Sequence, residues 1–374
     1  MPTKKLKNRQ DVEDFVRGCT FFGTGGGGLP ANGIRSLVNA LEEGLEVGWV
    51  DKDEIPDGAM SVCPFLMGSI AIHDKKTIQE MASYNMTDET SINLEGDRLC
   101  KAIGELEEYC GKKFQVIVPI ELAGANTAGA MAAGAKRGMI TVDGDYTGRA
   151  IPEIVQITFN YDGHSILPVA SVDEWGNVCV IKNAINPRTI EHIGKLISVA
   201  GYGLAGQAGM ALDAKKMKKT VIPGTLSECY KAGKLLREAR ETGRDPVKAL
   251  VESIHGYEVG RGTIVAKDDY DADGYYWGIT TVQCASDELK YWFKNENHVL
   301  WKNGVPFVTS PDIIAAIDTD TGEPVPNPLS RVGQHVALVV KACKSQQEQT
   351  ELLTPRYFGF DFDHIPVEKV MGNA

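Results

Sequence analysis

The chain has 374 residues, of which 43% are hydrophobic and 24% charged, and its 50 acidic and 39 basic residues give a formal net charge of −11. This length exceeds what one hydrophobic core usually supports, so two domains, or one large domain with a second lobe, are expected. The composition excludes a disordered or collagen-like chain, and the negative charge argues against nucleic acid and anionic membrane surfaces as partners.

The N-terminal part of the chain alternates predicted helices and strands. Residues 11–16 place apolar side chains on one helical face, and this helix is expected to end at Gly18, before a glycine run at 23–28. The next predicted elements are a helix at 32–43, strands at 47–51 and 59–68, and a helical segment at 93–112. This order is typical of an α/β domain.

The clearest unit is an apolar run at 114–120, a small-residue segment at 123–135 and a second apolar run at 139–142. A strand, a helix and a strand of these lengths predict a right-handed crossover between parallel strands. Glu121 and Asp143 each follow the carboxyl end of one of these strands, which is the edge of an open sheet where ligands bind. Both carboxylates are therefore candidate site residues.

The second half of the chain changes from helices to strands. Strand-like runs at 151–161 and 166–181 are followed by helices at 187–211 and 226–255. From about residue 257 the predicted strands are 260–266, 275–284, 289–293, 299–301, 307–308 and 336–340. We predict an α/β domain at 1–165, with a mixed or mostly parallel sheet flanked by helices, and a C-terminal domain at 166–374, in which helices join a β-rich sheet or barrel.

The glycine run from Gly23 to Gly28 is a candidate binding loop. Thr24 and the backbone N–H groups of the following glycines stand ahead of a helix, where they could hold an anion or a developing oxyanion. No Gly-Lys-Ser/Thr follows, as a Walker loop requires, and no clear strand precedes, as a dinucleotide loop requires. The alternative is a glycine turn that allows close packing.

A second candidate is the charged segment that follows the second strand of the crossover. Asp143, Asp145, Arg149 and Glu153 lie close together in sequence at that strand end. Paired carboxylates suit general-base catalysis or the binding of a divalent cation such as Zn²⁺ or Mg²⁺. The alternative is a turn or helix cap built from Asp and Gly.

The segment from Glu121 to Thr127 precedes the small-residue helix. Asn126 or Thr127 could cap that helix, and the glycine and alanines could serve close packing between helix and sheet. A capping role does not exclude a role in a site.

The N-terminal residues and the cysteine pattern indicate the cellular compartment of the protein. The first ten residues lack the apolar core of a secretory signal, and no segment has the length of a membrane span. The eight cysteines are dispersed, with no Cys-x-x-Cys pair, and Cys63, at a strand end, is the one candidate nucleophile among them. We predict a cytoplasmic protein with reduced thiols.

Several segments of the chain occur in a distinctive order. They are the glycine loop, Glu121 to Asn126, the run Asp143-Gly-Asp-Tyr-Thr-Gly-Arg-Ala-Ile-Pro-Glu153, and then the segments 294–296, 310–314, 321–324 and 355–361. In order and spacing, over nearly the whole chain, they resemble the S-methyl thiohydantoin desulfurase-like family, formerly of unknown function and often found beside or fused to hydantoinase and oxoprolinase proteins. One departure is residues 69–73, where the family tends to have a Pro followed later by a Glu-Lys pair. We expect this segment to shape the substrate pocket.

The resemblance implies a two-lobed fold and hydrolytic removal of sulfur from C2 of a hydantoin-like ring. We predict a hydrolase of a cyclic amide, thioamide or S-alkyl ring, in which Asp143 or Asp145 activates water directly or through a metal. Arg149 or the loop amides would stabilise the anionic intermediate, and Glu121 with Asn126 would orient the ring. The predicted catalytic residues are Asp143, Asp145, Arg149 and Glu121, and the predicted substrate-binding residues are Thr24, Gly25, Gly26, Gly27, Gly28, Asn126 and Glu153.

Two other functions are compatible with the sequence. The chain could be a non-catalytic binding subunit of a hydantoinase- or oxoprolinase-type assembly, or an ATP-using ring-opening enzyme with magnesium at Asp143 and Asp145. We expect a small heterocyclic ligand, a symmetric homo-oligomer, and a hydantoinase-type protein as a candidate partner. If the second lobe reaches the site, Asn295, Glu296 and Asp312 are its candidates.

Overall fold

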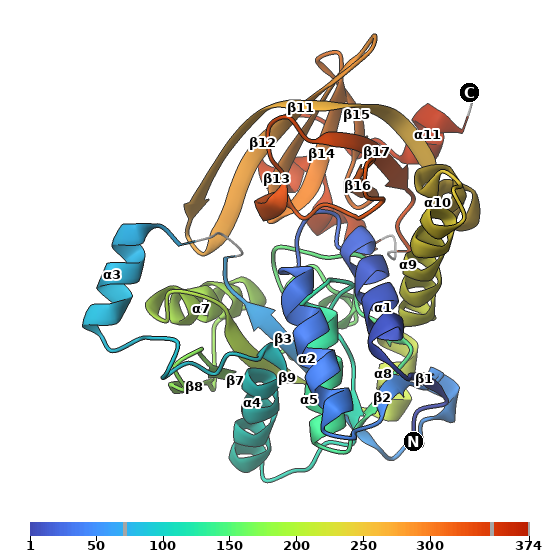
Figure 1. The fold of residues 1–374 in the computed structure, drawn as a ribbon. Coiled ribbons are helices and arrows are strands. Elements are labelled where there is room, and N and C mark those ends of the chain that lie inside the picture. Colours follow the sequence, from blue (N-terminus) through green and yellow to red (C-terminus); the bar gives the residue numbers. More distant parts are fainter. Residues whose placement is uncertain (70–72, 345–347, 373–374) are drawn as a thin grey trace.

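Two sheets organise the chain, one in each lobe (Figure 1). The computed structural model describes residues 1–69, 73–344 and 348–372. A mixed six-stranded sheet with its helices forms the lower lobe of Figure 1, and a curled antiparallel sheet of seven strands forms the upper lobe. The predicted fold class, a helix-flanked sheet joined to a β-rich lobe, is confirmed.

The helices lie mainly in the lower lobe and along one side of the molecule (Figure 1). They are α1 (Arg9–Phe22), α2 (Pro30–Glu42), α3 (Lys75–Ser83), α4 (Glu95–Cys110), α5 (Asn126–Lys136), α6 (Thr158–Tyr161), α7 (Pro187–Ala200), α8 (Ala214–Thr220), α9 (Thr225–Glu241), α10 (Pro246–Ile254) and α11 (Val367–Met371). None of these described helices has both the length and the apolar character needed to cross a membrane.

The lower sheet has the strand order β5-β4-β3-β9-β7-β8. Its strands are β3 (Met60–Met67), β4 (Val116–Ile117), β5 (Ile140–Thr141), β7 (Val169–Val172), β8 (Val178–Ile181) and β9 (Ala205–Asp213). β3, β4 and β5 are parallel, and α5 connects β4 to β5, which confirms the predicted crossover. β9, β7 and β8 join in antiparallel pairs, so this sheet takes strands from both sides of the predicted boundary at residue 165.

Two short strand pairs tie distant segments to this lobe. β1 (Lys4–Leu6) pairs with β2 (Val47–Trp49), and β6 (Gly144–Asp145) pairs with β10 (Ile222–Pro223). The second pair places the Asp-Gly-Asp segment directly beside the start of α9.

The upper sheet has the strand order β15-β14-β13-β12-β11-β17-β16, and all its pairs are antiparallel. Its strands are β11 (Tyr257–Ala272), β12 (Tyr275–Cys284), β13 (Glu288–Lys294), β14 (Glu296–Lys302), β15 (Val305–Thr309), β16 (Ile313–Asp318) and β17 (His335–Lys341). Alternating apolar residues such as Val282, Leu289 and Leu338 pack together in one core, and this buried face gives the strands their period of two.

Helices α1 and α9 pack with their backbones nearly in contact. A Cβ atom added at Gly18 of α1 would lie 1.7 Å from the Cys229 carbonyl oxygen of α9, and one added at Gly233 would lie 1.8 Å from the Asp14 carbonyl oxygen. The predicted end of the first helix at Gly18 is therefore wrong. The helix begins at the Asn8 cap, which accepts a hydrogen bond from the Asp11 N–H, and it continues to Phe22 because Gly18 permits this close approach.

We expect Gly18→Ala to lower the free energy of unfolding by about 2–3 kcal/mol, because the added methyl group must push two helical backbones apart. Urea denaturation measures the loss. Gly58→Ala is the matched control, since nothing lies within 4 Å of a Cβ atom at Gly58. Equal midpoints for the two variants would contradict the proposed contact.

Two other predictions of secondary structure are wrong. Residues 151–157 form no strand; they are a buried irregular segment whose N–H groups bind side chains, as Ile151 does to Glu121 and Ile154 to Glu191. The predicted helix at 187–211 ends at Ala200, and residues 205–213 form β9, because this small-residue segment is sandwiched between β3 and β7. Tertiary packing thus overrides the helix propensity of its alanines.

Candidate functional site

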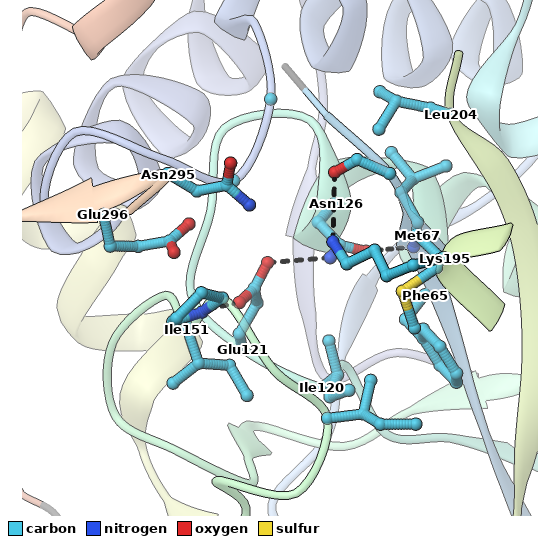
Figure 2. Close-up of a pocket in the computed structure, with 16 residues that line it drawn as sticks. Phe65, Met67, Ile120, Glu121, Asn126, Ile151, Lys195, Leu204, Asn295 and Glu296 are labelled. Carbon is cyan, nitrogen blue, oxygen red and sulfur yellow. Dashed lines mark hydrogen bonds between the residues drawn. The ribbon is translucent and has the colours of Figure 1, made fainter. Parts of the chain in front are cut away.

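Both lobes contribute residues to one pocket (Figure 2). The pocket lies at the carboxyl ends of the parallel strands β3 and β4, where the sequence predicts ligand binding, and it has a cavity volume of about 40 Å³. Its lining consists of Gly27, Gly28, Phe65, Leu66, Met67, Gly68, Ile120, Glu121, Asn126, Ile151, Pro152, Ile154, Lys195, Leu204, Asn295 and Glu296.

Glu121 is the central carboxyl of this lining, between Glu296 on one side and Asn126 on the other (Figure 2). Its side chain is held by two donors, the Asn126 amide at 2.7 Å and the Ile151 N–H at 2.8 Å. Only 4% of the residue is exposed, and this burial raises the pKa of Glu121 to about 7, while the two hydrogen bonds oppose the rise. Glu121 can therefore exchange a proton near neutral pH.

Asn126 orients Glu121 rather than capping α5. Its amide nitrogen donates to Glu121, and its amide oxygen accepts the Leu66 N–H at 2.9 Å, so both ends of the amide are fixed. The cap position is Ala125, which has no side-chain hydrogen bond to the helix. The alternative prediction of Asn126 as a helix cap is wrong.

Lys195 is the cation of the pocket, and it enters from α7 on the side opposite Glu296 (Figure 2). Its ammonium group donates to the Gly68 carbonyl at 3.3 Å, lies 3.9 Å from Glu191 and stands 4.1 Å above the Tyr275 ring. Burial lowers the pKa of Lys195, and the nearby carboxylates oppose that effect. A buried ammonium beside Glu121 is a suitable group to stabilise negative charge that develops in the pocket.

The second lobe supplies Asn295 and Glu296 through the turn between β13 and β14. Asn295 adopts a left-handed backbone conformation, with φ of 58°, which asparagine tolerates better than most residues. Its side-chain oxygen accepts the Tyr276 N–H, and the Asn327 amide donates to its carbonyl. These bonds fix the turn, so Glu296 at the start of β14 reaches the pocket. Asp312, the third candidate, instead accepts the N–H groups of Cys343 and Val367.

The glycine loop joins the lobes and touches the pocket at one end. Gly25 packs on the Asn327 side chain and Gly26 on the Glu296 side chain, where an added Cβ atom would collide with each. The Thr24 hydroxyl donates to the Ile314 carbonyl, so it is engaged within the protein. Gly27 and Gly28 line the pocket, and no described residue accepts a hydrogen bond from the N–H of either. Those two amides are the part of the loop that can meet a ligand.

Asp143 and Asp145 lie outside the pocket lining, each with its own protein partners. Asp143 accepts the Ser227 N–H at the start of α9 and forms an ion pair with Lys4 at 2.9 Å. Asp145 accepts the N–H groups of Thr147 and Gly148, and burial raises its pKa to about 6. These contacts match the alternative interpretation, a turn and helix cap built from Asp and Gly.

Arg149 and Glu153 also lie outside the lining, at the junction of the two lobes. The Arg149 guanidinium is fully buried and donates to four backbone carbonyls, those of Asn297, Pro311 and Asp312 in the upper lobe and of its neighbour Ala150. Glu153 accepts hydrogen bonds from Lys294 and Tyr357. Both residues hold the lobes together.

Comparison with known proteins identifies the family. The models of the S-Me-THD-like N-terminal domain and C-terminal domain match residues 10–183 and 185–367. The chain belongs to the S-methyl thiohydantoin desulfurase-like family. A crystal structure of a protein from Chromobacterium violaceum has the same fold, with a TM-score of 0.77 and 20% identity over 96% of this chain and 99% of that one. No curated protein matches the chain.

A metal site at Asp143 and Asp145 is one of the interpretations that the sequence leaves open. Within 1–69, 73–344 and 348–372, no three His, Cys, Asp or Glu side chains are grouped so that they could hold a metal ion.

Cys63 is fully buried, and burial raises its thiol pKa well above the ordinary value, which disfavours the nucleophilic thiolate.

Lys195 is the site residue that sequence reasoning missed. Glu191 and Lys195 are spaced i, i+4, which is typical of a surface ion pair on a helix. In the structure they share the buried face of α7 with Ile190, Gly194 and Ser198. The small residues at 194 and 198 are the signal that could have indicated this burial, because they leave the lysine stem room to cross the helix face.

Two further pockets adjoin the central pocket. One has a cavity volume of about 540 Å³ and shares Lys195 with the central pocket, and the other shares Gly28 and Leu204 with it. The two outer pockets have Ser69 and His73 in common. The segment expected to shape the substrate pocket, 69–73, therefore flanks this outer space with its two end residues; residues 70–72 lie outside the described part.

Proposed function

We propose that the chain is a hydrolase that replaces the sulfur at C2 of an S-alkyl thiohydantoin-like ring with oxygen from water. The observation that carries this proposal is Glu121, a buried carboxyl with a pKa of about 7 in a pocket lined by both lobes. General bases work best when their pKa lies near the working pH. The family to which the chain belongs supports the choice of ring.

Glu121 is the base that takes a proton from the attacking water. Each of its oxygens accepts one hydrogen bond, from Asn126 or from Ile151, and each keeps a second lone pair that can receive a proton. The two fixed donors also hold the carboxylate in one orientation, so the attacking water is positioned before the reaction begins.

The central pocket and the adjoining pocket of about 540 Å³, which shares Lys195 with it, together offer room for a small planar ring. Phe65, Met67 and Ile151 provide apolar surface for the ring faces, and the Gly27 and Gly28 N–H groups, which have no acceptor among the described residues, can donate to a ring carbonyl. Apolar walls with a few convergent polar groups are typical of sites for small heterocycles. Lys195 stabilises the negative charge that builds up as water adds to the ring.

The ATP-using alternative has less support. Gly25 and Gly26 pack against the side chains of Asn327 and Glu296, which leaves no room for phosphate at those glycines. Asp143 is paired with Lys4 and Asp145 with backbone N–H groups, so neither carboxylate is available to magnesium in this arrangement.

The direct test is turnover of S-methyl thiohydantoin, 2-thiohydantoin and hydantoin by the purified chain. We expect release of methanethiol from the first compound, with one oxygen atom from ¹⁸O-water in the ring product by mass spectrometry. Ring opening of hydantoin would indicate a cyclic amidase instead. Binding of the rings without any product would favour the non-catalytic subunit.

A further inference from the structure

A second carboxyl faces the same pocket from the opposite lobe. Glu296 lines the pocket and lies across from Glu121 and Lys195 (Figure 2). Glu296 follows the turn between β13 and β14, in which Asn295 forms hydrogen bonds with Tyr276 and Asn327. These bonds fix the turn, so the sheet itself holds the Glu296 side chain at the pocket. The two carboxyls therefore face one bound ring from two sides.

Glu296 forms no ion pair with any of the described residues. Only 1% of the residue is exposed, its Oε2 atom has no hydrogen-bond partner, and no Lys, Arg or His nitrogen of those residues lies within 4.0 Å of its carboxyl oxygens. The nearest cations are committed elsewhere, Lys195 to Gly68 and Glu191, and Arg149 to backbone carbonyls. Burial without an ion-pair partner disfavours the charged carboxylate, so the neutral form is favoured at this position.

The glycine loop makes room for this side chain. A Cβ atom at Gly26 would lie 1.9 Å from the Glu296 Oε1 atom, so a side chain at residue 26 would displace the carboxyl from this position. This contact assigns the close approach at Gly26 to the placement of Glu296, rather than to the binding of an anion.

The surroundings of the two carboxyls drive their proton affinities apart. Glu121 has two hydrogen-bond donors that favour its charged form, whereas Glu296 has none on Oε2. Burial, and the charge of Glu121 next to it, raise the pKa of Glu296 well above its ordinary range, while the charges of Arg149 and Lys195 oppose the rise. A pair of this kind separates into one base and one acid.

We propose that Glu296 is the catalytic proton donor of the site, with Glu121 as its complementary base. This inference rests on the proposed hydrolysis of an S-alkyl thiohydantoin-like ring. It assigns the acid to the upper lobe and the base to the lower lobe, so the site is complete only when the lobes are joined.

The proton transfers balance over one turnover. As the water oxygen bonds to C2, Glu121 takes a water proton, the C2=N electron pair moves onto the ring nitrogen, and Glu296 protonates that nitrogen. The C2–S bond then breaks, its electron pair leaves on sulfur, and Glu121 returns its proton to form the thiol. The C2 hydroxyl gives its proton to Glu296 as the C2=O bond forms. Ring and water become the 2-oxo ring and a thiol, and both carboxyls regain their starting states.

Glu296→Gln is the sharpest variant, because it keeps the size and a hydrogen-bond donor but cannot transfer a proton. With S-methyl thiohydantoin we expect kcat to fall by about 10²- to 10⁴-fold, with KM near the wild-type value. The alkaline limb of the wild-type pH profile, caused by ionisation of Glu296, should disappear in the variant. Glu296→Asp, which restores a carboxyl, should recover part of the rate.

A second readout does not depend on turnover. In wild-type protein at pH 8 we expect the infrared band of a protonated carboxyl, and this band should be lost in Glu296→Gln. Glu107→Gln is the matched control: Glu107 is a buried glutamate paired with Lys113 and Arg137 and lies outside the pocket lining. It should leave the band, the rate and the alkaline limb unchanged.

The outcomes separate this inference from the proposed function. Wild-type turnover combined with a full rate and an intact alkaline limb in Glu296→Gln would overturn the role of Glu296. Absence of any protonated-carboxyl band in the wild type at pH 8 would overturn it too, even if the variant failed to fold. Loss of the band in Glu296→Gln without wild-type turnover of any ring would support the neutral carboxyl and refute the proposed hydrolysis.

Discussion

Glu121→Gln is expected to lower kcat/KM for S-methyl thiohydantoin by about 10²- to 10⁴-fold, because the amide cannot accept a proton from water. In the wild type, kcat/KM should fall about tenfold for each pH unit below the Glu121 pKa of about 7, since only the deprotonated carboxylate is the base. The variant should lose this acidic limb. Initial rates of thiol release across pH 5–9 provide the measurement.

The same pKa has a consequence for stability. Glu121 binds its proton more tightly in the folded chain than at its ordinary pKa of 4.5, so its contribution to the free energy of unfolding is greatest below that value. The contribution is lost as the pH rises through about 7. Urea midpoints at pH 5 and pH 8 for wild type and Glu121→Gln should show a smaller pH dependence in the variant.

If kcat/KM of Glu121→Gln fell at acidic pH as it does in the wild type, that result would refute the role of Glu121 as the base.

Arg149→Met is expected to lower the free energy of unfolding by about 3–5 kcal/mol, because several buried carbonyls lose a charged donor at once. Three of these carbonyls belong to the upper lobe, so the variant should also weaken the junction between the lobes. Urea denaturation of the whole chain gives the loss.

Arg9→Met is the matched control for that variant, since Arg9 is an exposed arginine that, among the described residues, pairs only with Glu13 on the surface of α1. We expect it to change stability by less than about 0.5 kcal/mol. If Arg149→Met kept wild-type stability and lost activity, the arginine would be a catalytic group, as the sequence alone predicts, rather than a tie between lobes.

The parts of the fold that were predictable are those set by local pattern. The crossover from β4 through α5 to β5 could be recognised because apolar runs and small residues alternate within thirty residues or so. The strand β9 could not, because its glycines and alanines carry no period of two and become a strand only between β3 and β7. Position within the sheet decided that segment.

The lining of the candidate pocket was predictable in part, again from local pattern. Glu121, Asn126, Gly27 and Gly28 line the pocket because strand ends and loops before helices gather at one edge of a sheet. Lys195 enters through a helix whose charge spacing is that of a surface pair.

The charged segment after β5 shows the limit of local reasoning. Asp143 binds Lys4, 139 residues away, and Arg149 binds carbonyls more than 140 residues away. No local pattern reveals such partners. The sequence could therefore indicate that these charges are special, but not whether they act on a ligand or on the protein itself.

The most direct test of the account is a crystal structure of the Glu121→Gln variant with S-methyl thiohydantoin bound. We predict the ring in the central pocket between residue 121 and Glu296, with its C2–N edge toward Glu296 and Lys195 beside it. A ring bound at Asp143 and Asp145, with the central pocket empty, would contradict the account.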